Sequence, residues 1–282
     1  MKRLALLSAT CALALSACGI NSPVAPTGRT AYGLDAQGRL VTFGLDNAPL
    51  SVSRMNLSGL GAGETLVDLD VFNKDGNLYA LSDGGKLYGV NTTTGALTLN
   101  TSGNLGAPRV IDFNPAAQRL RVFSTGDMNY RLTPGDGTVT DDGMLMYAAT
   151  DAGAGKDPNL VAAAYTNSFQ GYQPVMADFN PPTTLFSIDA DQDTLVSHSS
   201  AAGSMPMGNF STLNTVGALG VNVSAEMTGF DIAGTNEAYL TSSNGTDTML
   251  YNLDLTSGKA TAKSTIKGLG LKAFAVKLSP RS

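Results

Sequence analysis

Short apolar segments recur along most of the chain, and a turn sequence rich in Gly, Asn or Asp follows each of them. The clearest unit has four such segments in succession, at residues 66–72, 78–81, 86–90 and 96–99. Runs of this length that contain β-branched and aromatic residues, separated by tight turns, are typical of antiparallel strands. We therefore expect the unit to be a four-stranded meander.

The same pattern recurs three times further along the chain. A second unit has its apolar segments at residues 109–113, 119–123, 129–132 and 138–140. A weaker unit has them at 160–165, 184–188 and 194–197. Another clear unit has them at 226–232, 238–241, 249–253 and 259–262. A repeat of supersecondary units outranks local propensity as a guide to architecture.

The two ends of the chain supply the parts of one more unit. Residues 30–34 and 39–43 form a unit that lacks its first strand, and residues 271–276 form a first strand without a unit. Joining them closes a ring and removes the exposed sheet edges of an open array. The sequence thus predicts an all-β fold, a five-bladed β-propeller of four-stranded antiparallel blades closed by pairing of the C-terminal strand with the N-terminal blade. A sandwich or an irregular solenoid is the alternative, because the third repeat is degenerate.

Composition agrees with this fold and narrows the set of partners. The chain of 282 residues contains 32 Gly and 12 Pro, only 15% of its residues are charged, and Glu occurs at positions 64, 226 and 237 alone. Long amphipathic helices are therefore not expected. The formal net charge is −5 and there is no basic cluster, so nucleic acid and anionic lipid are poor partners.

The first residues have the layout of a secretory signal peptide. Lys2 and Arg3 precede an apolar stretch from Leu4 to Leu15, which is too short for a permanent membrane span. The run Leu-Ser-Ala-Cys that ends at Cys18 resembles the bacterial lipoprotein signal, in which this cysteine is lipidated and becomes the first residue of the mature protein. An ordinary secreted protein is the alternative.

On this interpretation the protein is extracytoplasmic and anchored to the cell envelope. Gly19 follows the cysteine, and the resemblance then implies the outer membrane or cell surface. Residues 1–17 are the expected signal peptide, 18–29 the lipidated cysteine with a flexible tether, and 30–282 a single propeller domain. Cys11 is removed and Cys18 carries lipid, so no disulfide is expected in the mature protein.

Three segments carry a family resemblance that covers nearly all of the chain after the tether. They are Asp112-Phe-Asn-Pro115 followed by Arg119-Leu-Arg-Val122, residues 151–168, and residues 212–220. They resemble the bacterial domain-of-unknown-function family numbered 4394. The resemblance implies a secreted, propeller-like domain and brings no activity with it.

Motifs for common enzyme classes are missing from the sequence. The single histidine, His198, is not accompanied by a G-x-S-x-G nucleophile motif, and there is no phosphate-binding loop, H-E-x-x-H or dinucleotide-binding fingerprint. Hydrolase and nucleotide chemistry are therefore not expected, and no catalytic residue is assigned.

Two metal sites are nevertheless conceivable from residue type. His198 with Met205 and Met207 resembles copper-handling sites, since thioether sulfur suits copper. The alternate carboxylates of Asp189, Asp191 and Asp193 could converge on calcium. The corresponding structural interpretations are core-filling methionines and an ordinary hairpin turn.

Polar residues of the family segments form a third candidate site. They alternate along two predicted strands and continue after a strand of small residues; they are Arg119, Arg121, Asn129, Arg131, Tyr165 and Asn167. Several should share one face and bind a ligand, or else hydrogen-bond between blades.

Two functions remain. We expect a membrane-anchored extracytoplasmic lipoprotein that acts as a non-catalytic binding or assembly platform, with other envelope proteins or glycans as partners. The alternative is an extracytoplasmic copper-dependent oxidoreductase of oxidant defence, similar in activity to superoxide dismutase.

Overall fold

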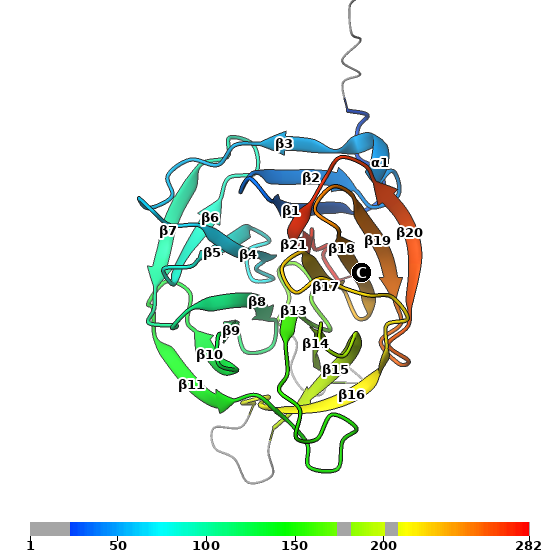
Figure 1. Ribbon diagram of the computed structural model, residues 1–282. Coiled ribbons are helices and arrows are strands. Elements are labelled where there is room, and N and C mark those ends of the chain that lie inside the picture. Colours follow the sequence, from blue (N-terminus) through cyan, green and yellow to red (C-terminus); the bar gives the residue numbers. More distant parts are fainter. Residues whose placement is uncertain (1–22, 174–181, 201–207, 282) are drawn as a thin grey trace, which may run out of the picture.

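The computed structural model describes residues 23–173, 182–200 and 208–281. Five antiparallel sheets are arranged in a ring around a central channel, as Figure 1 shows in a view along the channel. The fold predicted from the sequence, a five-bladed β-propeller, is confirmed. No helix in the described part of the chain is long and apolar enough to cross a membrane.

Each blade is named here by its number in the chain, and its strands are given from the channel outwards. Blade 1 consists of β21 (Leu271–Val276), β1 (Thr30–Asp35), β2 (Leu40–Gly44) and β3 (Ser53–Met55). Blade 2 consists of β4 (Leu66–Val71), β5 (Leu78–Ser82), β6 (Lys86–Val90) and β7 (Leu97–Ser102). Blade 3 consists of β8 (Pro108–Asn114), β9 (Arg119–Ser124), β10 (Met128–Leu132) and β11 (Val139–Met144).

The remaining elements complete the ring. Blade 4 consists of β13 (Leu160–Tyr165), β14 (Leu185–Asp189), β15 (Thr194–Ser199) and β16 (Thr212–Ala218). Blade 5 consists of β17 (Thr228–Ala233), β18 (Glu237–Ser243), β19 (Thr248–Leu253) and β20 (Ala260–Ile266). The short β12 (Met146–Tyr147) adds to blade 4 by parallel pairing with β16, and one short helix, α1 (Ala48–Ser51), precedes β3.

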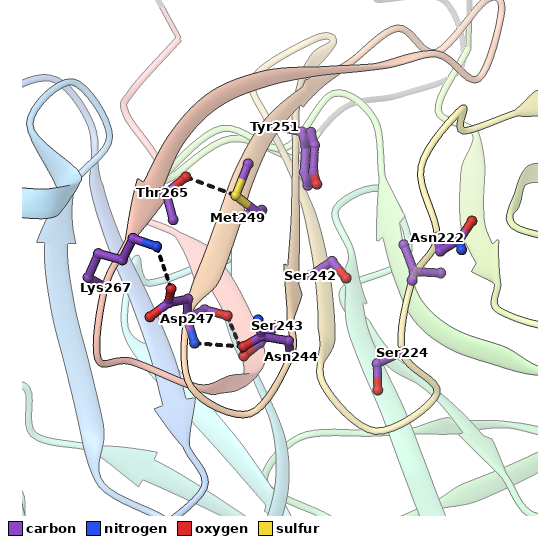
Figure 2. A pocket seen from close by; sticks show the side chains of 11 residues that line it. Asn222, Ser224, Ser242, Ser243, Asn244, Asp247, Met249, Tyr251, Thr265 and Lys267 are labelled. Carbon is purple, nitrogen blue, oxygen red and sulfur yellow. Dashed lines mark hydrogen bonds and ion pairs between the residues drawn. The ribbon is translucent and has the colours of Figure 1, made fainter.

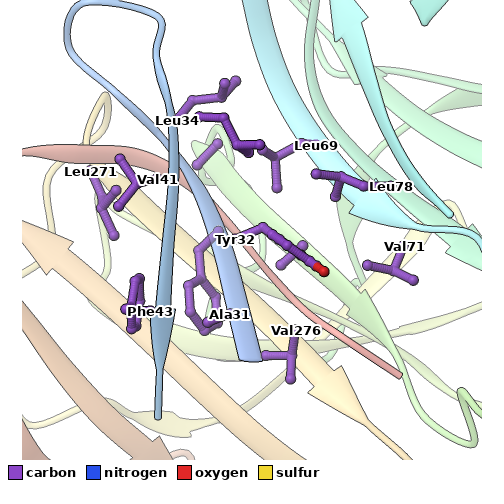
Figure 3. Packing of buried hydrophobic residues seen from close by; sticks show 14 of the residues in the cluster. Ala31, Tyr32, Leu34, Val41, Phe43, Leu69, Val71, Leu78, Leu271 and Val276 are labelled. Atoms are coloured by element: carbon purple, nitrogen blue, oxygen red, sulfur yellow. The ribbon is translucent and has the colours of Figure 1, made fainter. Parts of the chain in front are cut away.

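Blade 1 is built from both ends of the chain. β21 pairs antiparallel with β1, with Ala31 opposite Val276 and Asp35 opposite Leu271. Thus the predicted closure is confirmed. Figure 3 shows the side chains packed around this joint, where Phe43, Leu271 and Val276 lie in one buried cluster with residues of blade 2.

Turn chemistry explains why the same meander repeats. In the turn after β6, the Asn91 side-chain oxygen accepts hydrogen bonds from the backbone N–H groups of Thr93 and Thr94, and Gly95 then adopts a φ of 75°. Asn114 accepts from two N–H groups in the same way after β8, but there Gln118 takes the left-handed conformation, with a φ of 55°. The Asx side chain therefore shapes both turns, and glycine is not obligatory at the left-handed position.

Blade 4 departs most from the sequence pattern. Its outer strand β16 was not assigned as a strand from the sequence, because the long segment 200–211, and not a tight hairpin turn, separates it from β15. In blade 3, β11 also differs from the prediction, because it runs to Met144 and not only over residues 138–140. Its pairing with β10 contains an irregularity between Met128 and Tyr130. A bulge of this kind shifts the alternation on which sequence patterning depends.

Candidate functional site

The inner strands of all five blades begin at the same end of the channel, here called the channel face. A cavity of about 340 Å³, the mouth cavity, opens there. Its walls include Val67 of β4, Arg109 of β8, Val161 of β13, Thr228 of β17 and Lys272 of β21. The ring architecture itself therefore forms this cavity.

Charged side chains line the mouth cavity. Lys272 is partly buried, its ammonium group donates a hydrogen bond to the Leu66 carbonyl oxygen at 2.8 Å, and this burial lowers its pKa. Arg109 and Glu226 are exposed at the rim. The cavity thus offers groups of both signs to a polar ligand.

Three buried aspartates meet within the channel, one each from blades 2, 3 and 5. Ligand oxygens of Asp70, Asp112 and Asp231 lie within 4.8 Å of one another. Each carboxylate accepts a backbone N–H of the next inner strand: Asp70 from Phe113 at 2.7 Å, Asp112 from Tyr165 at 2.9 Å, and Asp231 from Val276 at 2.5 Å. These three aspartates, here called the channel aspartates, therefore connect neighbouring blades.

Burial changes the acidity of the channel aspartates. It raises the pKa of Asp231 to about 7, and burial together with repulsion from neighbouring carboxylates raises the pKa values of Asp70 and Asp112 well above their usual range. Three carboxylates so close could share a hard cation or a proton. This group was not among the candidate sites predicted from the sequence, because its members lie in three different repeats.

A second hollow lies on blade 5 and is shown in Figure 2. This blade 5 cleft has a volume of about 480 Å³. Hydroxyl and amide side chains are the most numerous in its lining, which also has one ion pair and the side chains of Val223, Met249 and Tyr251; the polar residues are Asn222, Ser224, Ser242, Ser243, Asn244, Asp247, Thr265 and Lys267.

Most polar groups of the blade 5 cleft are held in place. Lys267 and Asp247 form an ion pair at 2.7 Å, and this lysine holds the pKa of Asp247 below its usual value. The Asn244 side-chain oxygen accepts the backbone N–H of Asp247 at 2.8 Å, and Thr265 donates its hydroxyl to the Met249 sulfur at 2.9 Å. The cleft is therefore preorganised and carries no net charge.

The two hollows adjoin each other. Residues 222–224 line the blade 5 cleft, and the next two residues, Ala225 and Glu226, line the mouth cavity. This connecting segment runs from β16 to β17 across the channel face (Figure 1). None of these residues was a candidate from the sequence, since loop residues carry no periodic signal.

The structure brings together several of the polar residues expected to share a face. Arg121 is 1% exposed, and its guanidinium donates hydrogen bonds to Asn129 at 2.8 Å, to the Tyr165 hydroxyl at 3.1 Å and to the Gly208 carbonyl oxygen at 2.8 Å. It also pairs at 2.5 Å with Asp142, which sequence reasoning missed.

The other predicted members lie at or beyond the edge of this network. Arg131 pairs with the same Asp142 at 2.6 Å. Arg119 instead contacts Thr133, and Asn167 donates to Thr183 at 3.3 Å. The hydrogen bonds of Arg121 connect blade 3 to blade 4, as the between-blade alternative expected.

His198 lies in the same interface. Its ring stacks on Phe123 at 5.4 Å between centroids, Nδ1 lies 2.9 Å from the Phe210 carbonyl oxygen, and Nε2 lies 2.7 Å from Ser187 Oγ. Because a carbonyl oxygen only accepts, Nδ1 carries the proton and Ser187 donates to Nε2. Burial lowers the pKa of His198 to about 3, so the ring is neutral at physiological pH. Met205 and Met207, its predicted partners, are outside the described residues.

The carboxylates considered for calcium have separate partners. Asp189 accepts the Tyr147 hydroxyl at 2.6 Å, Asp191 accepts the Asn159 amide at 2.7 Å, and Asp193 accepts the backbone N–H of Val223 at 2.8 Å. Each of them thus anchors a different segment around the turn between β14 and β15. Cys18 precedes the first described residue.

Solved structures resemble this chain at low sequence identity. A structural genomics protein of unknown function from Bacteroides thetaiotaomicron is 12% identical, with a TM-score of 0.52 over 91% of this chain and 66% of that chain. A chain of a nidogen/laminin complex is 12% identical, with a TM-score of 0.49 over 90% of this chain and 99% of that chain. An auxiliary nutrient binding protein from Bacteroides ovatus is 10% identical, with a TM-score of 0.46 over 89% of this chain and 62% of that chain.

Sequence comparison identifies the family of this chain. No curated protein matches the sequence significantly. The model of one family, described as a domain of unknown function (DUF4394), matches residues 39–275, which include parts of all five blades. The chain therefore belongs to the DUF4394 family.

Proposed function

We propose that this protein is a lipid-anchored extracytoplasmic propeller that binds a neutral, hydroxyl-rich ligand such as a glycan segment on its channel face. The observation that carries the proposal is the pair of adjoining polar hollows, the blade 5 cleft and the mouth cavity, on one face of a rigid ring. Ligand sites of propellers and other repeat folds are commonly built from loops on one face.

The lining of the blade 5 cleft supports this ligand class. Hydroxyl and amide side chains offer both donors and acceptors, which is what a polyol requires. Because Asp247 and Lys267 neutralise each other, the cleft has no excess charge that would favour an ionic ligand. The volume of about 480 Å³ lies within the usual range for small-molecule sites.

The chemistry of the titratable groups supports a role in binding. A general base must be protonatable near neutral pH and within reach of substrate. The neutral His198 and its partner Ser187 are both buried between blades 3 and 4, with Ser187 0% exposed. The channel aspartates are buried and engaged in contacts between blades.

A glycan array followed by calorimetry tests the ligand assignment. The lipidated protein in detergent is expected to retain neutral oligosaccharides, and Ser242→Tyr, which fills the cleft, should abolish binding. Asn222→Ala should weaken binding about tenfold through loss of an amide contact. Ser53→Tyr and Asn104→Ala, at exposed positions on blade 1 and between blades 2 and 3, are matched controls that should bind normally. Binding that survives Ser242→Tyr, or the absence of any retained neutral glycan, would contradict the assignment.

Metabolic labelling with an alkyne fatty acid tests the anchor. The wild-type protein should incorporate the label and remain with the membrane after washing. Cys18→Ser should incorporate none, because the thiol that would accept the lipid is gone. Equal labelling of this variant would contradict the assignment of Cys18.

A further inference from the structure

Two of the most exposed large apolar side chains of the described chain lie side by side. Val24 is 54% exposed and Leu50 is 64% exposed, and the Val24 backbone N–H donates to the Leu50 carbonyl oxygen at 3.0 Å. They lie in a shallow groove of about 530 Å³ whose apolar lining also includes Pro23, Pro49, Val52 and Ile266. We call these six residues the rim patch.

The helix α1 fixes the start of the described chain to this patch. The Asn47 side chain donates to the Ala25 carbonyl oxygen at 2.9 Å and accepts the backbone N–H of Thr27 at 2.9 Å. Residues 23–27 are therefore held against α1, which carries Pro49 and Leu50.

The rim patch is close to the proposed lipid anchor. Only residues 19–23 lead from Cys18 to the patch. At the maximum extension of about 3.6 Å per residue, this segment spans about 18 Å. An acyl chain on Cys18 therefore keeps the patch within reach of the lipid headgroups.

We propose that the rim patch docks onto the surface of the membrane that holds the anchor, with Val24 and Leu50 inserted among phospholipid headgroups. This inference rests on the proposed lipidation of Cys18. The exposed apolar side chains supply the attraction, and the short tether gives a weak contact a high effective concentration. Arg54 and Lys267 also line the groove, so cationic groups lie beside the patch, where they can contact lipid phosphates.

Docking at this position sets the orientation of the ring. α1 lies on the outer rim, between β3 and β20, in the view along the channel (Figure 1). A propeller resting on this part of its rim has its channel axis roughly parallel to the membrane, which leaves the channel face open at its side. Lys267 lines both the groove of the rim patch and the blade 5 cleft, so the proposed ligand site lies beside the membrane.

The absence of tryptophan from the sequence permits a direct test. Leu50→Trp introduces a single reporter at the patch, and Leu99→Trp introduces a matched control at a residue 55% exposed on β7. Both lipidated variants are reconstituted into phosphatidylcholine vesicles that contain brominated lipid. We expect the indole fluorescence of Leu50→Trp to be quenched at least threefold more strongly than that of Leu99→Trp, with a blue-shifted emission. Equal quenching would overturn the docking proposal.

Additional measurements separate docking from anchoring. Vesicle flotation of the wild-type protein is measured first: its loss would contradict the anchor and the docking together, whereas flotation with equal quenching contradicts the docking alone. Adding Val24→Asp to Leu50→Trp should reduce the quenching to the control level, and adding Leu99→Asp should not. Thermal melting of each variant confirms that the propeller is folded, so that lost quenching reports lost insertion.

Discussion

Buried aspartates occur in two regions of the propeller under opposite electrostatic conditions. Between blades 3 and 4, Asp142 has a fully buried side chain that pairs with two guanidinium groups, those of Arg121 and Arg131. In the channel, Asp70, Asp112 and Asp231 accept backbone N–H groups and face one another. The residue type and the degree of burial are alike, but only Asp142 has a counterion.

This difference shows that burial alone does not define the contribution of a carboxylate to stability. Asp142 compensates buried positive charge, so its loss leaves a cation unpaired in a region of low dielectric constant. The channel aspartates mainly provide acceptors for the N–H groups of neighbouring inner strands, and their negative charge is unfavourable there. Removing charge should therefore have opposite effects in the two regions.

The largest expected effect is that of Asp142→Asn. The variant keeps the shape of the side chain but leaves the buried Arg121 without its counterion, and we expect a loss of about 3–5 kcal/mol in the free energy of unfolding. Urea denaturation measures it. Asp141→Asn, at the adjacent exposed position, should change stability by less than about 0.5 kcal/mol. If both variants lost a similar amount of free energy of unfolding, the loss could not be attributed to the missing counterion of Arg121.

In the channel, Asp231→Asn should stabilise the protein above pH 7. Because the pKa of Asp231 is about 7 when folded and near its ordinary value of 3.8 when unfolded, the folded state holds a proton that the unfolded state has released between these values. Stability therefore falls as pH rises from about 4 to 7, by up to about 1.4 kcal/mol per pH unit for this group. The asparagine retains one oxygen as the acceptor for Val276, gives up the oxygen that accepts the Ile232 N–H, and should flatten this slope.

Denaturation of wild type and Asp231→Asn across this pH range measures the slope. The two proteins should converge below about pH 3, where the carboxyl is neutral in both states. A variant that is less stable than the wild type at pH 8 would show that the negative charge of Asp231 is favourable in the channel.

A smaller effect is expected where the two regions meet, at Tyr165. Its backbone N–H donates to Asp112, and its hydroxyl accepts from Arg121. Tyr165→Phe keeps the backbone contact, removes the hydroxyl and leaves the buried Arg121 donor without this acceptor, which should cost about 1–2 kcal/mol. In Tyr79→Phe the lost hydroxyl contact is to Asp75 in an exposed turn, and the cost should be less than about 0.5 kcal/mol. Equal costs in thermal melting would contradict the distinction.

Much of the fold could be predicted from the sequence because the blades are encoded locally. The apolar run Leu78-Tyr-Ala-Leu81 and the Asx turns at Asn91 and Asn114 are recognised within a few residues. The closure followed from an unpaired first strand at 271–276. β16 and α1 were not assigned from the sequence, because a long segment separates β16 from β15 and α1 has only four residues, too few for a helical period.

The candidate site was much less predictable because its residues come from distant parts of the chain. The partners of Arg121 include the carbonyl oxygen of Gly208, 87 positions away, and a backbone group has no sequence signature. The channel aspartates each occupy an ordinary strand position, and only the ring brings them together. The polar lining of the blade 5 cleft comes partly from loops, where composition does not indicate which side chains converge.

The pairing of β1 with β21 has a consequence for the order of folding. β1 pairs with β2 along one edge, but its other edge finds a partner only in β21, so blade 1 is completed by a contact of very high sequence separation. Loop-closure entropy makes such contacts slow to form. Blades 2 to 5 consist of consecutive strands and can form while Thr30–Asp35 still presents an unpaired edge. Aggregation during synthesis should therefore begin at this edge, and the arrival of the final strand ends that exposure.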